Sequence, residues 1–257
     1  MWRAAFELDL RSSVRALPVA PALTLLGIPV ALELSCVFTL ALASWTVADA
    51  ILPLAAPGRP ALAYWTGGTT TALLLLASLA AHELAHALAA RRADVRLRGI
   101  SLSLFGGAIE LAEPPRSAAD ELRIAIAGPL ANFGLAVAMA VTHVVLVEMA
   151  VDPLTAAVPA VLAVLNAGLA LANLIPAAPL DGGRIANALL WRITGQPGVA
   201  TRALATLGRI LAGLFLGVCF MSSISGDAGL ALWAGLIGLT LWKEEPATRD
   251  RRVAVQA

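Results

Sequence analysis

One short motif in the sequence is typical of zinc chemistry: His82-Glu83-Leu84-Ala85-His86. Residues four apart lie on the same face of an α-helix, so both imidazoles can reach one ion. Glu83 can then act as the general base toward a metal-activated water. Because the chain has only three histidines and nine glutamates, this pattern arises by chance in about one such chain in a thousand. We therefore predict a metal site here rather than an incidental polar cluster.

Asp181 is the best candidate for the third protein ligand that a catalytic zinc site normally has. It follows Pro176 and Pro179, which break the expected fourth membrane span. Irregular backbone at membrane depth is tolerated only where protein or a water-filled cavity surrounds it. A carboxylate carried on such a break can meet the two histidines from another element. The alternative is that Asp181 only caps the following helix.

Two amides are expected near the same site. Asn132 lies at the depth expected for His82, and Asn173 precedes the break. Either amide can hold a substrate strand or donate to a developing oxyanion, although buried amides in bundles also simply join helices. Glu110 and Glu113 could approach the metal from the segment after the second span, but His82, His86 and Asp181 already complete the usual ligand set. His143 is expected near the opposite membrane surface, too far away to reach it.

The composition indicates that a membrane protein positions these residues. Of the 257 residues, 59% are hydrophobic and 14% charged, against roughly 45–50% and 25% in soluble domains. The net charge of +1 excludes the strongly basic surface that nucleic-acid binding requires. Cys36 and Cys219 lie in apolar stretches, so we expect core residues rather than a disulfide or a zinc knuckle.

The expected fold is an all-α polytopic membrane protein with about six transmembrane helices, since about 20 apolar residues cross a bilayer. The expected spans are 32–52, 68–90, 122–147, 155–177, 203–224 and 228–242. Between the second and third spans, residues 96–113 alternate apolar and polar around two glycines, which predicts a small β-hairpin at the membrane surface. A flexible loop is the alternative. We expect one domain over 1–257, with an extended or amphipathic lead-in (1–31), a six-span core (32–242) and a cytoplasmic tail (243–257).

The distribution of basic residues predicts the orientation of these helices. Seventeen of the eighteen Lys and Arg residues fall on the side of the expected spans that carries the N-terminus, and only Arg59 falls on the other. By the positive-inside rule, both termini and the metal site face the cytoplasm of a cell (inner or plasma) membrane.

The chain resembles the site-2 protease family of intramembrane zinc metalloproteases, peptidase family M50, in its compact six-span form from bacteria and archaea. Four motifs beside His82–His86 carry the resemblance, in the family's order: Gly27-Ile28-Pro29, Phe105-Gly106-Gly107, the segment 121–132 with Gly128-Pro129 and Asn132, and the segment 173–184 with Asn173 and Leu180-Asp181-Gly182-Gly183-Arg184. The sequence differs from many relatives at Glu33, where they often carry a histidine. Many relatives also have PDZ or CBS domains, and we expect neither in this chain.

The resemblance implies one Zn²⁺ on His82, His86 and Asp181, with Glu83 as the base and Asn173 assisting. It further implies cleavage of transmembrane protein substrates near the cytoplasmic leaflet of the lipid bilayer, with the hairpin guiding an unwound substrate. An anti-sigma factor or a membrane-tethered regulator is compatible with the family. Two other functions remain open: a small transporter with an ion site at the broken helix, and a non-catalytic homologue that only binds client proteins.

Overall fold

The computed structural model describes residues 23–103 and 106–242. The helical elements are α1 (Cys36–Thr46), the π-helical turn η1 (Val47–Ile51), α2 (Leu52–Ala55), α3 (Ala61–Arg92), α4 (Ala118–Glu148), α5 (Pro153–Asn173), α6 (Asp181–Thr194), α7 (Thr201–Ser225) and α8 (Ala228–Trp242). Four strands complete the described fold: β1 (Leu23–Leu25), β2 (Ile28–Leu32), β3 (Leu97–Ser103) and β4 (Gly106–Leu111). Phe105, most of the expected lead-in and the expected tail lie outside the described residues.

Five helical segments are long and apolar enough to cross a membrane: Cys36–Ala55, α3, α4, α5 and α7. The shorter helix α8 is also apolar, with 15 residues. The predicted class, a mainly helical polytopic membrane protein, is confirmed. The sixth span stays a prediction, because α8 is shorter than the roughly 20 residues that a bilayer requires.

The boundaries of the first two spans differ from those expected. Residues 28–32 form β2, so the first helical segment begins only at Cys36 and continues to Ala55. The second span begins at Ala61 instead of residue 68, directly after Pro60. Pro60 is the N-cap residue, and proline is tolerated there because the first N–H groups of a helix have no partner within the helix. The hydroxyl of Tyr64 donates to the carbonyl of Ala56, which ties this first turn to the preceding segment.

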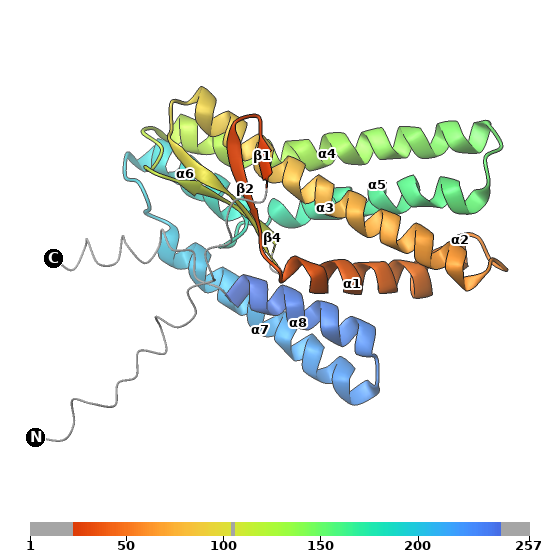
Figure 1. Cartoon of the computed structure of the whole chain (residues 1–257). Coiled ribbons are helices and arrows are strands. Elements are labelled where there is room, and N and C mark those ends of the chain that lie inside the picture. The colour runs from red at the N-terminus through yellow and green to blue at the C-terminus, as the bar shows by residue number, and fades with distance from the viewer. Residues whose placement is uncertain (1–22, 104–105, 243–257) are drawn as a thin grey trace, which may run out of the picture.

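The expected hairpin is present and forms part of a larger sheet. β3 and β4 pair antiparallel, β3 also pairs parallel with β2, and β2 pairs antiparallel with β1, giving the order β1-β2-β3-β4. The flexible-loop alternative for residues 96–113 is therefore wrong. The buried face of this sheet packs on α3, where Ile28, Val30, Ile100 and Leu102 surround Ala87. Figure 1 shows the sheet and α6 gathered at one end of the long helices.

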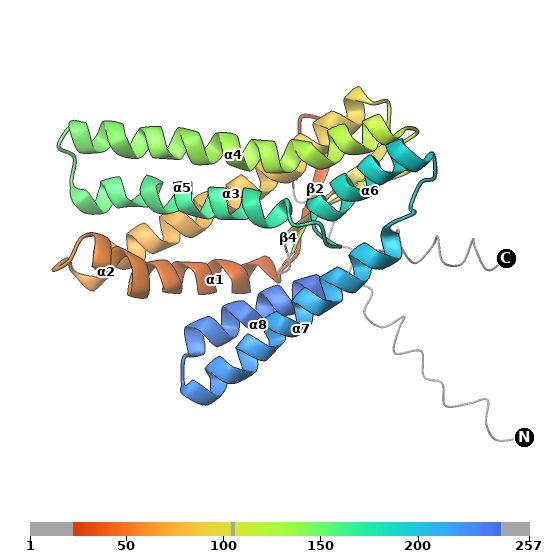
Figure 2. The same ribbon diagram turned by 180° about the vertical axis from the view of Figure 1, so that it is seen from behind.

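The break in the expected fourth span separates two helices. α5 ends at Asn173, an irregular segment covers 174–180, and α6 starts at Asp181. α7 packs along α8, and both views show this pair diverging from α4 and α5 (Figures 1 and 2). α7 also touches the break, because the amide N–H of Ala178 donates to the carbonyl of Leu204 over 3.1 Å.

Candidate metal centre

The two histidines of the motif lie on one face of α3, as their spacing of four residues predicts. Both are buried, with 4% of His82 and 2% of His86 exposed. Helix α3 has 32 residues and its last turn carries Arg91 and Arg92, whose charge favours a helix C-terminus. The histidines therefore sit well inside a long, continuous helix, which limits how far either can move relative to the other.

Asp181 comes from the other side of the site, as the first residue of α6. Leu180 occupies the N-cap position and this helix end has no side-chain cap, so the alternative in which Asp181 only caps the helix is wrong. Gly182 and Gly183 lie directly against the backbone of residues 174–178, where a Cβ would overlap carbonyl atoms. These two glycines let α6 begin tightly against the irregular segment, with Asp181 turned toward α3.

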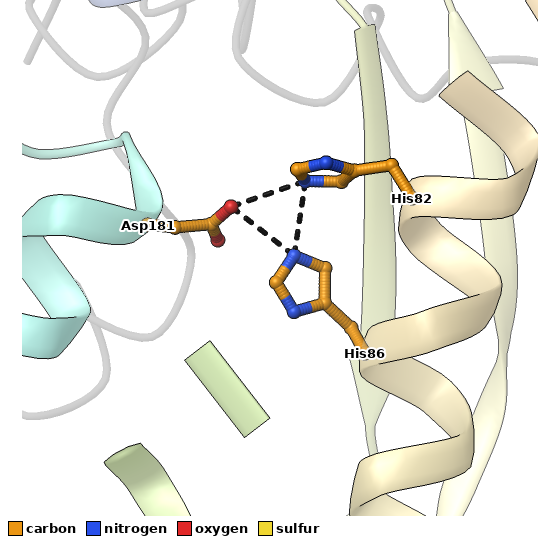
Figure 3. A group of neighbouring side chains, drawn as sticks. All are labelled: His82, His86 and Asp181. Atoms are coloured by element: carbon orange, nitrogen blue, oxygen red, sulfur yellow. Dashed lines mark hydrogen bonds and ion pairs between the residues drawn. The ribbon is translucent and has the colours of Figure 1, made fainter. Parts of the chain in front are cut away.

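Three side-chain atoms converge between these helices (Figure 3). Nε2 of His82 and Nε2 of His86 are 3.0 Å apart, and each is 3.1 Å from Oδ2 of Asp181. All three residues are buried, and within the described residues they form the one group of His, Cys, Asp or Glu side chains with the spacing of a metal site. The predicted convergence of Asp181 on the histidine pair is thus seen in the structure.

The orientation of His86 suits a cation. Its Nδ1 is 2.6 Å from the carbonyl oxygen of Ile124. A carbonyl only accepts, so Nδ1 donates to it, and Nε2 is the ring nitrogen that faces His82 and Asp181. An Nδ1–H···O=C bond is the support typical of a metal-binding histidine, because it directs the other ring nitrogen to the metal.

The space for an ion is provided by Gly128 on α4. A Cβ built on this residue would lie 2.5 Å from Nε2 of His82, and closer still to Nε2 of His86. Zinc–nitrogen distances are about 2.0–2.1 Å, so the missing methyl group leaves a space about where an ion bound by both rings would sit. Two nitrogens, one carboxylate oxygen and this space match the ligand set of a catalytic zinc site.

The charge of Asp181 also suits a cation. Burial alone would raise the pKa of its carboxyl, but hydrogen bonds and charge from His82 and His86 outweigh burial, so that the pKa lies well below the ordinary value for Asp. The carboxyl is therefore ionised at neutral pH.

Glu83 is buried beside the group, with 7% of the residue exposed, and it lies against β4. A Cβ on Gly107 would lie 2.7 Å from both Cδ and Oε1 of Glu83. β4 is one of the two edge strands of the sheet within the described residues, and β1 is the other. The structure therefore gathers a carboxylate, a possible ion site and a strand edge in one place.

The other predicted residues are distributed differently. Asn132 is fully buried on α4, and neither amide atom has a hydrogen-bond partner within the described residues. Asn173 is half-buried at the end of α5. Glu110 is exposed and Glu113 pairs with Arg116, and neither belongs to the converging group.

His143 lies apart from the site, as predicted. Its Nδ1 contacts the carbonyl of Ala156 at 2.8 Å, which joins α4 to α5. Both cysteines are free thiols; Cys36 is buried, as expected for a core residue, whereas Cys219 is only half-buried. A cavity of about 720 Å³ between α3, α4 and α5 is lined mainly by apolar side chains and contains none of the three converging residues.

Four contributions were not predicted from the sequence: the carbonyl of Ile124, the missing side chains of Gly107 and Gly128, and the ion pair between Glu121 and Arg184. All except Gly107 lie within segments 121–132 and 173–184, so the motifs indicated the region without the contacts. These contacts join residues of different helices and strands, and a single sequence does not show which of those elements are neighbours.

Comparison with known proteins gives consistent matches. Residues 70–161 and 145–216 match the model of peptidase family M50. Rip3 of Mycobacterium tuberculosis is 36% identical over 229 residues, which cover 89% of this chain and 57% of Rip3. A zinc metalloprotease of Methanocaldococcus jannaschii is 35% identical over 146 residues, 56% of this chain and 41% of that protein. The chain thus spans little more than half the length of Rip3.

A similar fold occurs in a solved structure. The site-2 protease from Methanocaldococcus jannaschii superposes with a TM-score of 0.58 at 26% sequence identity. The match covers 86% of this chain and 90% of that one.

Proposed function

The chain belongs to peptidase family M50, and on that premise we propose that it is an intramembrane zinc endopeptidase. Its substrates are membrane-anchored proteins, cut within or near their transmembrane segments. The observation that carries this proposal is the convergence of Nε2 of His82, Nε2 of His86 and Oδ2 of Asp181 within 3.1 Å of one another. These three residues would hold the zinc. When bound, zinc would polarise the scissile carbonyl and make water a stronger acid.

Glu83 acts as the general base in this proposal. It follows His82 directly on α3 and is buried, so its carboxylate can take the proton of the attacking water and deliver it to the leaving nitrogen. Asn132 and Asn173 assist by holding the substrate or donating to the developing oxyanion. The buried amide of Asn132, which has no partner within the described residues, supports a role toward a bound group.

The edge strand β4 receives the substrate. A regular transmembrane helix shields its carbonyls, so the substrate must unwind locally before attack. An extended segment that pairs with β4 would satisfy its own backbone groups. Because Gly107 of β4 lies against Glu83, the paired segment would pass beside the proposed base. The favoured cut is therefore near helix-breaking residues of the substrate.

The proposed location is a cell membrane, with both termini and the active site toward the cytoplasm. The asymmetry of Lys and Arg along the sequence supports this orientation. The partners would be transmembrane proteins, of which an anti-sigma factor and a membrane-tethered regulator are examples, together with the lipid bilayer itself.

Replacement Glu83→Gln tests the function. The variant is expected to keep one zinc per chain and to lose cleavage of tagged membrane substrates by about 10²–10⁴-fold, the usual contribution of a general base. Glu148→Gln, at the exposed far end of α4, is the matched control and is expected to cleave normally. Substrates trapped by Glu83→Gln can be identified by mass spectrometry.

Other outcomes would support the alternatives. A wild-type protein that binds clients without cutting them would indicate the non-catalytic homologue. Ion flux into proteoliposomes that survives Glu83→Gln, without any cleavage by the wild type, would indicate the transporter. Either result would overturn the proposed function.

A further inference from the structure

The three proposed zinc ligands come from two different helices, which hold them with different rigidity. His82 and His86 are fixed to each other by one turn of α3, whereas Asp181 starts α6 after the irregular segment 174–180. A metal site tolerates distance errors of only about 0.2 Å. Some contact must therefore set the position of α6 relative to the histidines.

Helix α4 contacts both α3, which carries the two histidines, and α6, which carries Asp181, and it does so with one face. The carbonyl of Ile124 accepts from His86, and Gly128 leaves the space between the two rings. One turn earlier, Oε1 of Glu121 accepts from Nε of Arg184 on α6 at 3.0 Å. Residues 121, 124 and 128 follow each other at intervals of three and four, so they share one side of the helix.

Arg184 is well placed to transmit this contact to the metal ligand. It is the third residue after Asp181, so the two side chains lie on neighbouring positions of the same side of α6. Both partners of the ion pair are largely shielded, with 18% of the Arg184 side chain and 15% of the Glu121 side chain exposed. The planar guanidinium also constrains direction more strongly than an ammonium group would.

We propose that the ion pair between Glu121 and Arg184 is a positioning element that holds α6 so that Asp181 faces both imidazoles. A shielded ion pair is weak evidence for a gain in stability, because desolvation offsets much of the attraction. The ion pair is better explained by its effect on geometry. It joins α6, which carries Asp181, to α4, whose Ile124 carbonyl orients His86. The proposal rests on the zinc site of the proposed function.

A neighbouring ion pair provides the matched control. Arg123 pairs with Asp120 at 3.3 Å in the same first turn of α4, but this pair stays within α4 and 74% of the Arg123 side chain is exposed. Removing it changes the charge of the same turn while leaving the contact between α4 and α6 in place.

The test measures zinc affinity by chelator competition and the visible spectrum of the Co²⁺-substituted protein, for the wild type, Glu121→Gln, Arg184→Gln and Arg123→Gln. Loss of a group that orients a ligand typically weakens metal binding 10–100-fold. We expect that loss for Glu121→Gln and Arg184→Gln, with altered cobalt bands, and a change of less than about twofold for Arg123→Gln. Arg184→Lys is expected to recover part of the affinity, because it restores the charge but not the planar donor.

Zinc affinities and cobalt spectra of Glu121→Gln and Arg184→Gln that match the wild type would overturn the proposal. If either Gln variant fails to fold, Glu121→Asp and Arg184→Lys take its place. Each of these two variants keeps the charge of the residue it replaces but moves the atoms that form the ion pair. Each is therefore expected to weaken zinc binding about tenfold. Unchanged affinity again overturns the proposal. A wild-type protein that binds no zinc would instead refute the proposed function, so the two failures are distinguishable.

Discussion

Substitution Gly128→Ala is the sharpest test of where the metal lies. The added methyl group would sit 2.5 Å from Nε2 of His82, 2.6 Å from its Cε1, and closer still to Nε2 of His86. Ordinary van der Waals contact begins at 3.4 Å. Nε2 of His82 must therefore withdraw by about 0.9 Å and that of His86 by more, whereas zinc coordination tolerates about 0.2 Å.

The expected loss of affinity follows from these shifts. Structural zinc sites with four ligands bind zinc with roughly 10–16 kcal/mol, or about 3 kcal/mol per ligand. Every 1.4 kcal/mol corresponds to a factor of ten. Withdrawal of a single imidazole is thus expected to weaken zinc binding by about 100-fold, and the methyl group faces both rings. Cleavage is expected to fall with zinc occupancy.

The same helix contains a matched control. A Cβ on Gly134 would meet nothing within 4 Å, so Gly134→Ala repeats the chemical change on α4 without touching the site. Alanine is favoured over glycine in a helix by about 1 kcal/mol, and this gain applies to both variants. Zinc content, zinc affinity by chelator competition and cleavage of a tagged membrane substrate are measured for both. If Gly128→Ala binds one zinc per chain with an affinity within tenfold of Gly134→Ala, the assignment of this space to the metal is refuted.

Three further substitutions test, one by one, the role of Glu83, the contact between α4 and α5, and the segment that precedes Asp181. Gly107→Ala adds a methyl group against Glu83 and is expected to lower kcat at least 10²-fold with zinc content unchanged; equal loss of zinc would contradict a role confined to Glu83. His143→Ala removes the contact between α4 and α5 and is expected to cost about 1 kcal/mol of unfolding free energy, while zinc affinity stays constant. Gly208→Ala adds a methyl group against the carbonyl of Ala178 and is expected to weaken zinc binding by shifting the segment before Asp181. Gly213→Ala on the same helix meets nothing within 4 Å and serves as its control, and equal zinc affinities for this last pair would refute the coupling.

The part of the site that depends on local spacing could be predicted from the sequence. The interval of four between His82 and His86 fixes their common face in any helix. Asp181 could be selected because prolines break the helix that leads to it. The histidine pair and the broken span therefore needed no knowledge of which helices are neighbours.

The parts that depend on contacts between distant elements could not be predicted. β2 pairs with β3, whose partners lie about 70 residues further along the chain, and only residues 33–35 separate Ile28–Leu32 from the apolar helix α1. Hydrophobic pattern alone cannot divide such a run into a strand and a membrane span. Gly128 appears in the sequence as one of 21 glycines, and only the approach of α4 to α3 shows that its missing side chain leaves room for an ion.

The arrangement of the ligands indicates which part of the site controls metal binding. The histidine pair is held within one long helix and its geometry changes little unless α3 itself unfolds. Asp181, in contrast, depends on contacts from two other helices: Arg184 with Glu121 on α4, and Ala178 with Leu204 on α7. Because α7 also packs along α8, a displacement of that helix pair would reach Asp181 before it reached either histidine. Zinc affinity should therefore fall more when the contact between Glu121 and Arg184 or the contact between Ala178 and Leu204 is disturbed. Substitutions along the outer half of α3 should change it less.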